Sequence, residues 1–209
     1  MLKVLDHPLI THKLAIMRDE NTGTKDFSQQ LDEIAGLMAY EVSRDLPVKE
    51  KDVKTPMGIC HTYELAKKVV LVPVLRAGMG MVGGIRDMIP TAKVGFVGLY
   101  RDEETLEPQQ YYFKVPNMED AVVMVLDPML ATGGSMELAY KAFITKGQPR
   151  RLIFASVIAS QQGVKYLQKA FPGNEVELYT AAIDPELNEH KYIVPGLGDA
   201  GDLCYGEKL

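Results

Sequence analysis

Apolar residues along the chain follow two kinds of pattern, one typical of helices and one typical of buried strands. From residue 26 onward the apolar positions Phe27, Leu31, Ile34, Met38 and Val42 recur every three or four residues. This is the spacing of one helix face, and it predicts packing. Continuous apolar runs rich in β-branched residues occupy 69–75, 94–100, 121–126 and 152–158. Such runs are typical of parallel strands that are buried on both faces.

Helix-length segments separate these runs, so the pattern predicts an α/β protein whose mostly parallel central sheet is flanked by helices. Pro8 suits the first turn of a short helix that runs to about Arg18, and Asp26 is expected to cap the longer helix. Segments 48–61 and 111–115 look like additional strands. The chain of 209 residues has the length of one domain.

Composition narrows the functional classes. A formal net charge of -5 argues against a nucleic-acid surface, so no nucleic-acid partner is expected. No apolar run approaches the length of a membrane span, and the protein is expected to be cytoplasmic with no membrane partner. Cys60 and Cys204 form neither a disulfide framework nor a metal set, and each is expected to be a small buried residue.

Charged residues follow three of the predicted strands. Arg76 comes after the run 69–75, Arg101 after 94–100 and Asp127 after 121–126. In open α/β sheets ligands bind beyond the carboxyl ends of the strands. A single arginine at such a place is usually a solvated surface charge, but three features at three strand ends indicate a site for an anion.

The strongest local signal is the stretch 127–135. Thr132, Gly133, Gly134 and Ser135 offer backbone N–H groups and two hydroxyls, and the expected helix 136–146 directs its positive dipole end to the same place. Asp127 would repel a bare phosphate, so it is expected to serve a hydroxyl or a metal beside it. A phosphorylated sugar satisfies both demands.

Residues 78–83 give a competing signal. They satisfy the Gly-x-Gly-x-x-Gly fingerprint of dinucleotide-binding proteins, after a predicted strand and before a helix. Asp102 lies near the place of the expected ribose-binding acid, but Arg101 stands directly before it. About a third of the chain also precedes the fingerprint, which usually sits on the first strand of its domain. A dehydrogenase that binds NAD is therefore the weaker interpretation.

Several motifs together resemble one family, the type I phosphoribosyltransferases in their uracil phosphoribosyltransferase form. The stretch 127–135 is similar to that family's loop for phosphoribosyl diphosphate (PRPP), and the tail 192–202 resembles its uracil-binding segment. Residues 73–78, 99–103 and the opening 6–9 resemble it too, so the resemblance covers essentially the whole chain. Most type I relatives carry a second acid where this chain has Pro128, and the uracil branch shares the proline.

The resemblance implies a type I phosphoribosyltransferase fold over residues 1–209, with a core at about 60–185 and a small hood formed by the N-terminal segment and about 186–209. It implies transfer of ribose 5-phosphate from PRPP to N1 of uracil, which gives UMP and diphosphate in pyrimidine salvage. Mg²⁺ is the expected cofactor, held through PRPP and water rather than by direct protein ligands.

The same resemblance assigns the site residues. The catalytic group is expected to be Arg76, Arg101, Asp127 and Asp199. PRPP is expected to bind Arg76, Arg101, Asp127, Pro128, Met129, Leu130, Ala131, Thr132, Gly133, Gly134, Ser135 and Asp199. Uracil is expected to meet the backbone of Ile193, Gly198, Asp199 and Ala200. From composition alone, Asp199 would be a turn residue in a Gly-rich loop.

The tail carries almost no polar side chain suited to a base, so main-chain groups are expected to match the donor and acceptors of uracil. No convincing general base is found, and His190 is expected to be a surface residue. The acidic loop between Arg101 and Gln110 is expected to be a flap that closes over the donor.

The resemblance also implies a homo-oligomer, either a dimer or a tetramer, and activation by GTP as in some relatives. Two rival functions stay open. A PRPP-binding regulatory protein of the same fold would keep the 127–135 loop and add a basic RNA surface, which a pI near 5.4 disfavours. The NAD-dependent dehydrogenase is the other.

Overall fold

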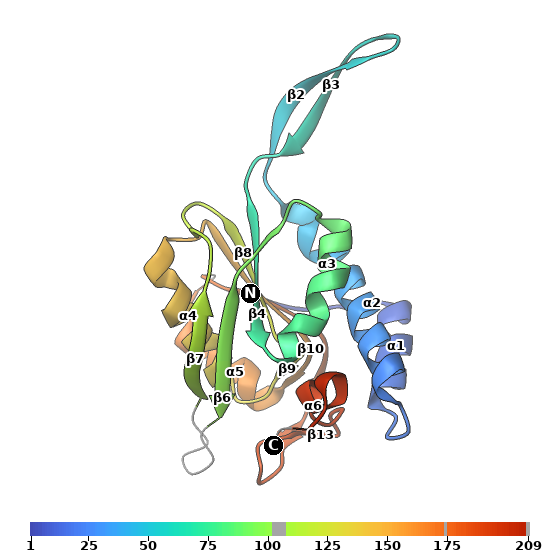
Figure 1. The fold of residues 1–209 in the computed structure, drawn as a ribbon, viewed down its shortest axis with the longest axis vertical. Helices are drawn as coiled ribbons and strands as arrows, with labels where there is room; N and C mark the ends of the chain where they lie inside the picture. Colours follow the sequence, from blue (N-terminus) through green and yellow to red (C-terminus); the bar gives the residue numbers. More distant parts are fainter. Residues whose placement is uncertain (102–107, 174, 208–209) are drawn as a thin grey trace.

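The computed structural model describes residues 1–101, 108–173 and 175–207, with only the backbone for Arg101 and Pro108. A nine-stranded sheet runs through the centre of the molecule (Figure 1). Its main path has the order β1-β11-β10-β8-β4-β6-β7, and β5 and β9 pair with β4 and β10. The strands are β1 (Leu2–Val4), β4 (Val69–Leu75), β5 (Lys93–Val94), β6 (Phe96–Arg101), β7 (Pro108–Lys114), β8 (Val122–Leu126), β9 (Met129–Leu130), β10 (Arg151–Ser160) and β11 (Glu177–Asp184).

The direction of the strands confirms the predicted sheet. The pairings recorded within this sheet are parallel except that of β6 with β7, which is antiparallel. The expected strand 94–100 is divided into β5 and β6 at Gly95, where a Cβ would lie 2.8 Å from the Val115 backbone. Strand β11 had no counterpart among the predicted strands.

Helices cover both faces of this sheet (Figure 1). Helices α1 (Pro8–Arg18), α2 (Thr24–Val42) and α3 (Val82–Met88) pack on one face, and α4 (Gly134–Phe143) and α5 (Gln161–Ala170) pack on the other. Leu71 of β4 belongs to the hydrophobic cluster that includes α1, α2 and α3. Val70 and Val72 belong to the cluster that includes α4 and α5. Both faces of the strand are therefore buried, which explains its unbroken apolar run. Within the described ranges, no helix is long and apolar enough to cross a membrane.

Helix α1 starts where it was predicted to start, and helix α2 does not. Helix α1 has the predicted bounds, and His7 caps it by accepting a hydrogen bond from the Leu9 N–H at 3.2 Å. Helix α2 begins at Thr24 with Gly23 as its N-cap, so the predicted cap Asp26 is wrong. Asp26 lies in the first turn, where its charge favours the helix dipole. Two 3₁₀ turns, η1 (Ser43–Asp45) and η3 (Ile144–Lys146), extend α2 and α4.

The glycines of the dinucleotide fingerprint lie inside helices. Residues 77–81 form the 3₁₀ helix η2, and α3 follows directly. A Cβ on Gly83 would lie 2.5 Å from the Asp32 carboxylate of α2, and the Gly84 N–H donates to the same Asp32 carboxylate at 2.6 Å. These glycines let α2 and α3 approach closely. Because helix packing accounts for these glycines, their spacing no longer supports a dinucleotide site.

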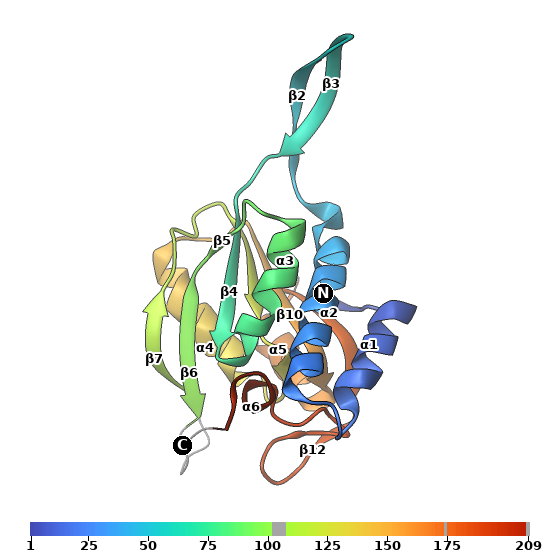
Figure 2. The same cartoon turned by 45° about the vertical axis from the view of Figure 1, so that its right-hand side comes forward.

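A two-stranded hairpin projects from the body (Figures 1 and 2). It consists of β2 (Val48–Thr55) and β3 (Gly58–Leu65), paired antiparallel from Val48 opposite Leu65 to Thr55 opposite Gly58. The predicted strand 48–61 is thus one strand, a turn and part of a second. Cys60 on this hairpin is exposed, and Cys204 is half-buried, so the expectation of two buried cysteines is wrong.

The C-terminal residues cover the end of the sheet that lies away from the hairpin (Figure 2). They form β12 (Glu186–Leu187), β13 (Ile193–Val194) and the short helix α6 (Ala200–Tyr205). Ile193, Leu197 and Ala200 join the same hydrophobic cluster as α1 and α2. At the other end of the chain, β1 is the edge strand of the central sheet. The expected division into a core at about 60–185 and a hood stays a prediction.

Candidate active site

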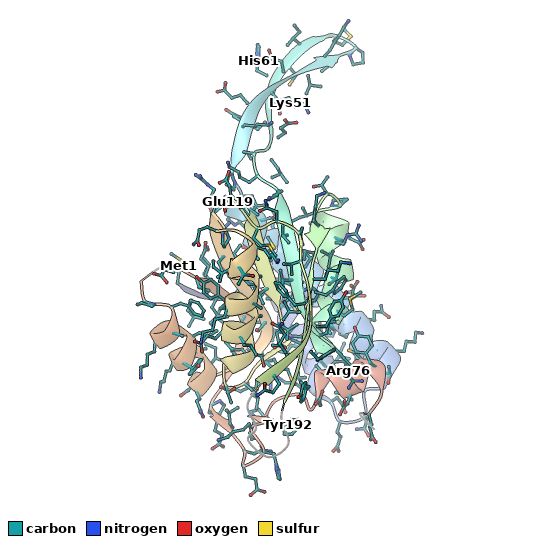
Figure 3. All side chains as sticks on the ribbon, turned by 60° about the vertical axis from the view of Figure 1, so that its left-hand side comes forward. Met1, Lys51, His61, Arg76, Glu119 and Tyr192 are labelled. Atoms are coloured by element: carbon teal, nitrogen blue, oxygen red, sulfur yellow. The ribbon has the colours of Figure 1, made fainter. Side chains whose placement is uncertain are left out.

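Three neighbouring strands end at one edge of the sheet and bring the predicted groups to it. Strands β8, β4 and β6 are consecutive and parallel, so their carboxyl ends share that edge. Asp127 follows β8, Arg76 follows β4 and Arg101 is the last residue of β6. The side chain of Arg101 lies outside what the structure describes. Figure 3 shows Arg76 and Tyr192 at the end of the molecule opposite to His61 and Glu119.

The loop after β8 leads directly into helix α4. Helix α4 begins at Gly134, two residues earlier than predicted, so Gly134 and Ser135 lie in its first turn. Gly133 is its N-cap and has no side chain to occupy the first N–H groups. Those groups carry the positive end of the helix dipole, which favours an anion at this position. The loop geometry therefore fits a phosphate.

Gly133 adopts a backbone conformation that other residues disfavour. Its φ of 90° lies in the left-handed region. A Cβ at this position would also lie 2.6 Å from the ring of Tyr166 on α5. Strand β10 also holds the loop, since the hydroxyl of its last residue, Ser160, donates to the Ala131 carbonyl at 2.5 Å. Both the glycine and its neighbours thus fix the shape of the loop.

One acid lies in the first turn of α4, where it could compete with a bound anion. Glu137 contacts the Lys141 ammonium at 2.6 Å and accepts a hydrogen bond from the Tyr166 hydroxyl. The hydrogen bonds from Lys141 and Tyr166 lower the pKa of Glu137 below its ordinary value. The pKa of Tyr166 is raised by the same contact with Glu137. The carboxylate is therefore directed toward its own helix and α5.

Arg76 is held by the C-terminal helix. Its Nη2 donates to the Asp202 carboxylate at 2.6 Å, and its Nη1 donates to the Gly206 carbonyl at 3.1 Å. Both side chains of the ion pair are about one-third exposed, at 34% and 29%. The guanidinium can therefore reach solvent and a ligand while its orientation is set. Asp202 had not been predicted as part of the site.

Asp199 is the N-cap of α6, and its carboxylate accepts hydrogen bonds from the N–H groups of Gly201 at 2.8 Å and Asp202 at 3.1 Å. This role agrees with the expectation from composition, a turn residue in a Gly-rich loop. It also orients the carboxylate beside Arg76. A role of Asp199 in PRPP binding stays a prediction.

An open hollow of about 430 Å³ lies over this region and is lined by Gly198, Asp199, Asp202, Leu203 and Glu207. Carboxylate oxygens are the ligands that Mg²⁺ accepts, usually one or two of them with substrate phosphates and water. The lining therefore fits a magnesium ion carried in with a diphosphate. Within the described part of the chain, no group of three or more His, Cys, Asp or Glu residues could hold a metal by itself.

The predicted uracil-binding segment runs between β13 and α6. Ile193 is buried, Ala200 is fully buried and Gly198 has a φ of 82° in the left-handed region. Strand β13 pairs antiparallel with β12, and the Asn188 side chain accepts from the N–H of Tyr192 at 2.9 Å. The segment is therefore ordered by backbone pairing on one side and by the α6 cap on the other.

An ion pair next to this segment, with a buried carboxylate and a partly exposed guanidinium, was not predicted. Arg18, the last residue of α1, donates two hydrogen bonds to the Asp184 carboxylate at 2.7 Å. Asp184 ends β11 and is 5% exposed. The rule of inspecting the residue at each strand's carboxyl end would have found Asp184, had β11 been predicted.

Two further predictions concern His190 and the loop between Arg101 and Gln110. His190 is exposed, as expected for a surface residue. The proposed flap between Arg101 and Gln110 falls mostly on residues 102–107, which lie outside the described residues.

The family model for uracil phosphoribosyltransferase matches residues 4–207. The chain belongs to the uracil phosphoribosyltransferase family. It is 52% identical over 209 residues to the uracil phosphoribosyltransferase of Limosilactobacillus fermentum, covering 99% of this chain and 98% of that one. The solved structure of the AQ2163 protein of Aquifex aeolicus is similar, with a TM-score of 0.94, 38% identity and full coverage of both chains.

More distant relatives share only the fold. A hypoxanthine-guanine phosphoribosyltransferase of Bacillus anthracis superimposes with a TM-score of 0.52 at 14% identity, over 77% of this chain and 80% of that one. The type I phosphoribosyltransferase fold is thus confirmed. Membership in the uracil phosphoribosyltransferase family also decides for the enzyme and against the regulatory and dehydrogenase interpretations.

Proposed function

We propose that the edge formed by β8, β4 and α6 is where this uracil phosphoribosyltransferase transfers ribose 5-phosphate from PRPP to N1 of uracil. The 5-phosphate binds the 127–135 loop, Arg76 meets the diphosphate, and the backbone of residues 193–200 receives the base. The supporting observation is that Arg76, which follows β4, is bonded to Asp202 of the C-terminal helix at 2.6 Å. Donor-binding and base-binding groups are therefore neighbours.

The chemistry explains why these groups are needed together. The anomeric carbon of ribose develops positive charge as diphosphate leaves, so the leaving anion must be neutralised while the sugar is held in line with the base. Arg76 supplies a fixed positive charge, and Arg101 is proposed to supply another. The α4 N-terminus fixes the phosphate, and Asp127 holds a ribose hydroxyl at the lip of the loop.

Mg²⁺ is proposed to enter with PRPP and, when bound, to share the neutralisation of the diphosphate. The carboxylate of Asp199 lines the hollow and is the group that would meet the hydrated ion. Removal of Mg²⁺ with a chelator is expected to abolish turnover. Addition of Mg²⁺ should restore it.

The base is proposed to be read by main-chain groups of Ile193, Gly198, Asp199 and Ala200. Cytosine would face such a site with donor against donor and acceptor against acceptor. Each unpaired buried group costs about 1–3 kcal/mol, so two mismatches suppress cytosine use by roughly two orders of magnitude or more. A protein base for the N1 proton is not part of the proposal.

The deciding experiment measures UMP and diphosphate formed from uracil and PRPP with Mg²⁺, and repeats it with cytosine. UMP formation with strong rejection of cytosine is expected. Efficient use of cytosine would show that the base is read elsewhere. If no UMP forms, the proposed reaction is contradicted.

A second copy of the chain is the proposed partner of the β2–β3 hairpin. Isolated two-stranded hairpins are marginally stable in water, and the register of this one places the exposed apolar side chains of Val48, Ile59, Tyr63 and Leu65 on one face. Such a patch marks an interaction surface. Replacement of Ile59 by lysine is expected to lower the molecular mass measured by light scattering from that of an oligomer to that of one chain.

GTP activation and a cytoplasmic location remain predictions from the family resemblance and the sequence. Turnover measured at low PRPP with and without GTP tests the first, and cell fractionation tests the second.

A further inference from the structure

The turn at Gly196 is the midpoint of the proposed base-binding segment. Gly196 has a φ of 64°, and a Cβ at this position would overlap the Ile193 carbonyl oxygen. Only glycine fits such a turn without strain. The contacts that hold Gly196 therefore also fix the position of the Ile193 carbonyl.

Both backbone groups of Gly196 are bonded to the Arg18–Asp184 ion pair. Its N–H donates to the Asp184 carboxylate at 2.9 Å, and its carbonyl accepts from Arg18 Nη1, also at 2.9 Å. The same Nη1 donates to Asp184 at 2.7 Å, and Nη2 donates to the second carboxylate oxygen at 2.7 Å. The guanidinium, the carboxylate and the Gly196 backbone thus form one closed set of four hydrogen bonds.

We propose that Arg18 and Asp184 are positioning residues for the acceptor base. They hold the Gly196 turn and thereby set where the backbone of Ile193 and Gly198 meets uracil. This inference rests on the proposed function, since it concerns the segment proposed to bind the base. Neither side chain touches the reacting atoms in this role.

Residue type matters at both positions. A guanidinium presents several N–H donors in a fixed plane, which lets Arg18 bond both carboxylate oxygens and a carbonyl together. A lysine ammonium is a point charge on a flexible stem and cannot keep this geometry. Asparagine in place of Asp184 keeps one acceptor oxygen for the Gly196 N–H but loses the charge.

The ion pair bonds directly to the Gly196 turn and lies away from Arg76. Its link to the phosphate loop is indirect, since Asp184 is in register with Ser160, whose hydroxyl donates to the Ala131 carbonyl. Asp184 ends β11, which is separated from β8 by β10, whereas Arg76 follows β4 on the other side of β8. Loss of the ion pair should therefore disturb the two substrates unequally. This asymmetry separates a positioning role from a general loss of stability.

The test compares Arg18→Lys and Asp184→Asn with Arg44→Lys, which alters an exposed arginine of η1 that is paired to Glu41 of α2 at 3.0 Å. The KM for uracil is expected to rise roughly ten- to a hundred-fold in both test variants, because small misplacements of binding groups have effects of this size. The KM for PRPP should stay unchanged. The control should match the unmodified enzyme in both.

Hydrogen exchange gives a readout that does not depend on turnover. In Arg18→Lys the amides of 193–198 are expected to exchange faster, while those of β8 and β4 keep their protection. Should Arg18→Lys fail to fold, Asp184→Asn carries the test, since it removes a charge without changing shape.

Equal rises in both KM values, or an unchanged KM for uracil in folded variants, would overturn the inference. If uracil turnover is lost in Ala200→Pro but normal in the Arg18 and Asp184 variants, the base site stands and only the positioning role fails. If the unmodified protein does not use uracil, the proposed function fails, and the inference fails with it.

Discussion

On the donor side of the site, the groups that would hold phosphate follow one another along the chain from Asp127 to Ser135, and a strand and a helix on either side set their positions. On the base side, the segment 193–200 is held by side chains far away in the sequence. The Arg18–Asp184 ion pair spans 166 residues, and the Arg76–Asp202 pair spans 126. The phosphate loop is thus shaped mainly by its own residues, with support from Ser160 and Tyr166, whereas the base segment depends on contacts across almost the whole chain.

Substitution of Gly133 by alanine should have the largest effect and should fall on the donor side. The left-handed φ and the Tyr166 ring both oppose a Cβ, so the loop must move. A shift of about 1 Å in a binding group can cost roughly a hundred-fold in rate, and that loss is expected in kcat/KM for PRPP. Gly173→Ala is the control, because its φ of 76° is similar and nothing lies within 4 Å. Equal losses in both variants would indicate strain alone.

Arg76→Ala is expected to come next. Hydrogen bonds to charged groups contribute about 1.5–3 kcal/mol, so kcat/KM for PRPP should fall roughly ten- to a hundred-fold while direct binding of uracil changes little. Arg150→Ala removes an exposed arginine that lies 3.8 Å from Asp120 and serves as the control. Normal donor kinetics in Arg76→Ala would contradict its placement at the diphosphate.

Ala200→Pro tests the base side directly. Ala200 is the first residue of α6, a position that accepts proline, and Asp199 before it has an extended ψ of 106°. The helix should therefore form, while the N–H proposed to meet a uracil carbonyl is deleted. Uracil turnover should fall about ten-fold or more, since an unpaired buried group costs about 1–3 kcal/mol, and PRPP binding should persist.

Gln161→Pro is the matched control, because Gln161 is the exposed first residue of α5. It should leave both substrates unaffected. Comparable uracil turnover in Ala200→Pro and Gln161→Pro would contradict base reading by that N–H.

The smallest effect is expected where the two sides meet. Asp202→Asn leaves a hydrogen-bonding group beside Arg76 but removes a negative charge that the diphosphate would face. Exposed ion pairs contribute about 0.2–1 kcal/mol, so the KM for PRPP should fall by no more than about five-fold, and less at high salt. Asp120→Asn, which alters an exposed carboxylate paired with Lys67, is the control. An increase in KM would mean that Asp202 mainly orients Arg76.

The same contrast explains what the sequence could predict. Helix α1 and strand β4 match their predicted bounds, because spacing and turn residues are local properties. Asp127 and Arg76 were found from their places after apolar runs. Arg18, Asp184 and Asp202 were missed, because an ion pair between distant elements leaves no pattern in either stretch. The hairpin turn at residues 56–57 was missed as well, since the exposed strands on both sides carry no alternation of buried residues.

The long sequence separation of Arg18 and Asp184 also has a consequence for folding during translation. During translation the chain emerges from its N-terminus, and Arg18 is made long before Asp184 and Gly196. Strand β1 must likewise wait for β11, its parallel partner in the sheet. The first helix therefore leaves the ribosome without its ionic and backbone partners. A ribosome stalled before residue 184 would carry the complete 127–135 loop but not the segment proposed to bind the base, so the acceptor specificity proposed for that segment would arise only near the end of synthesis.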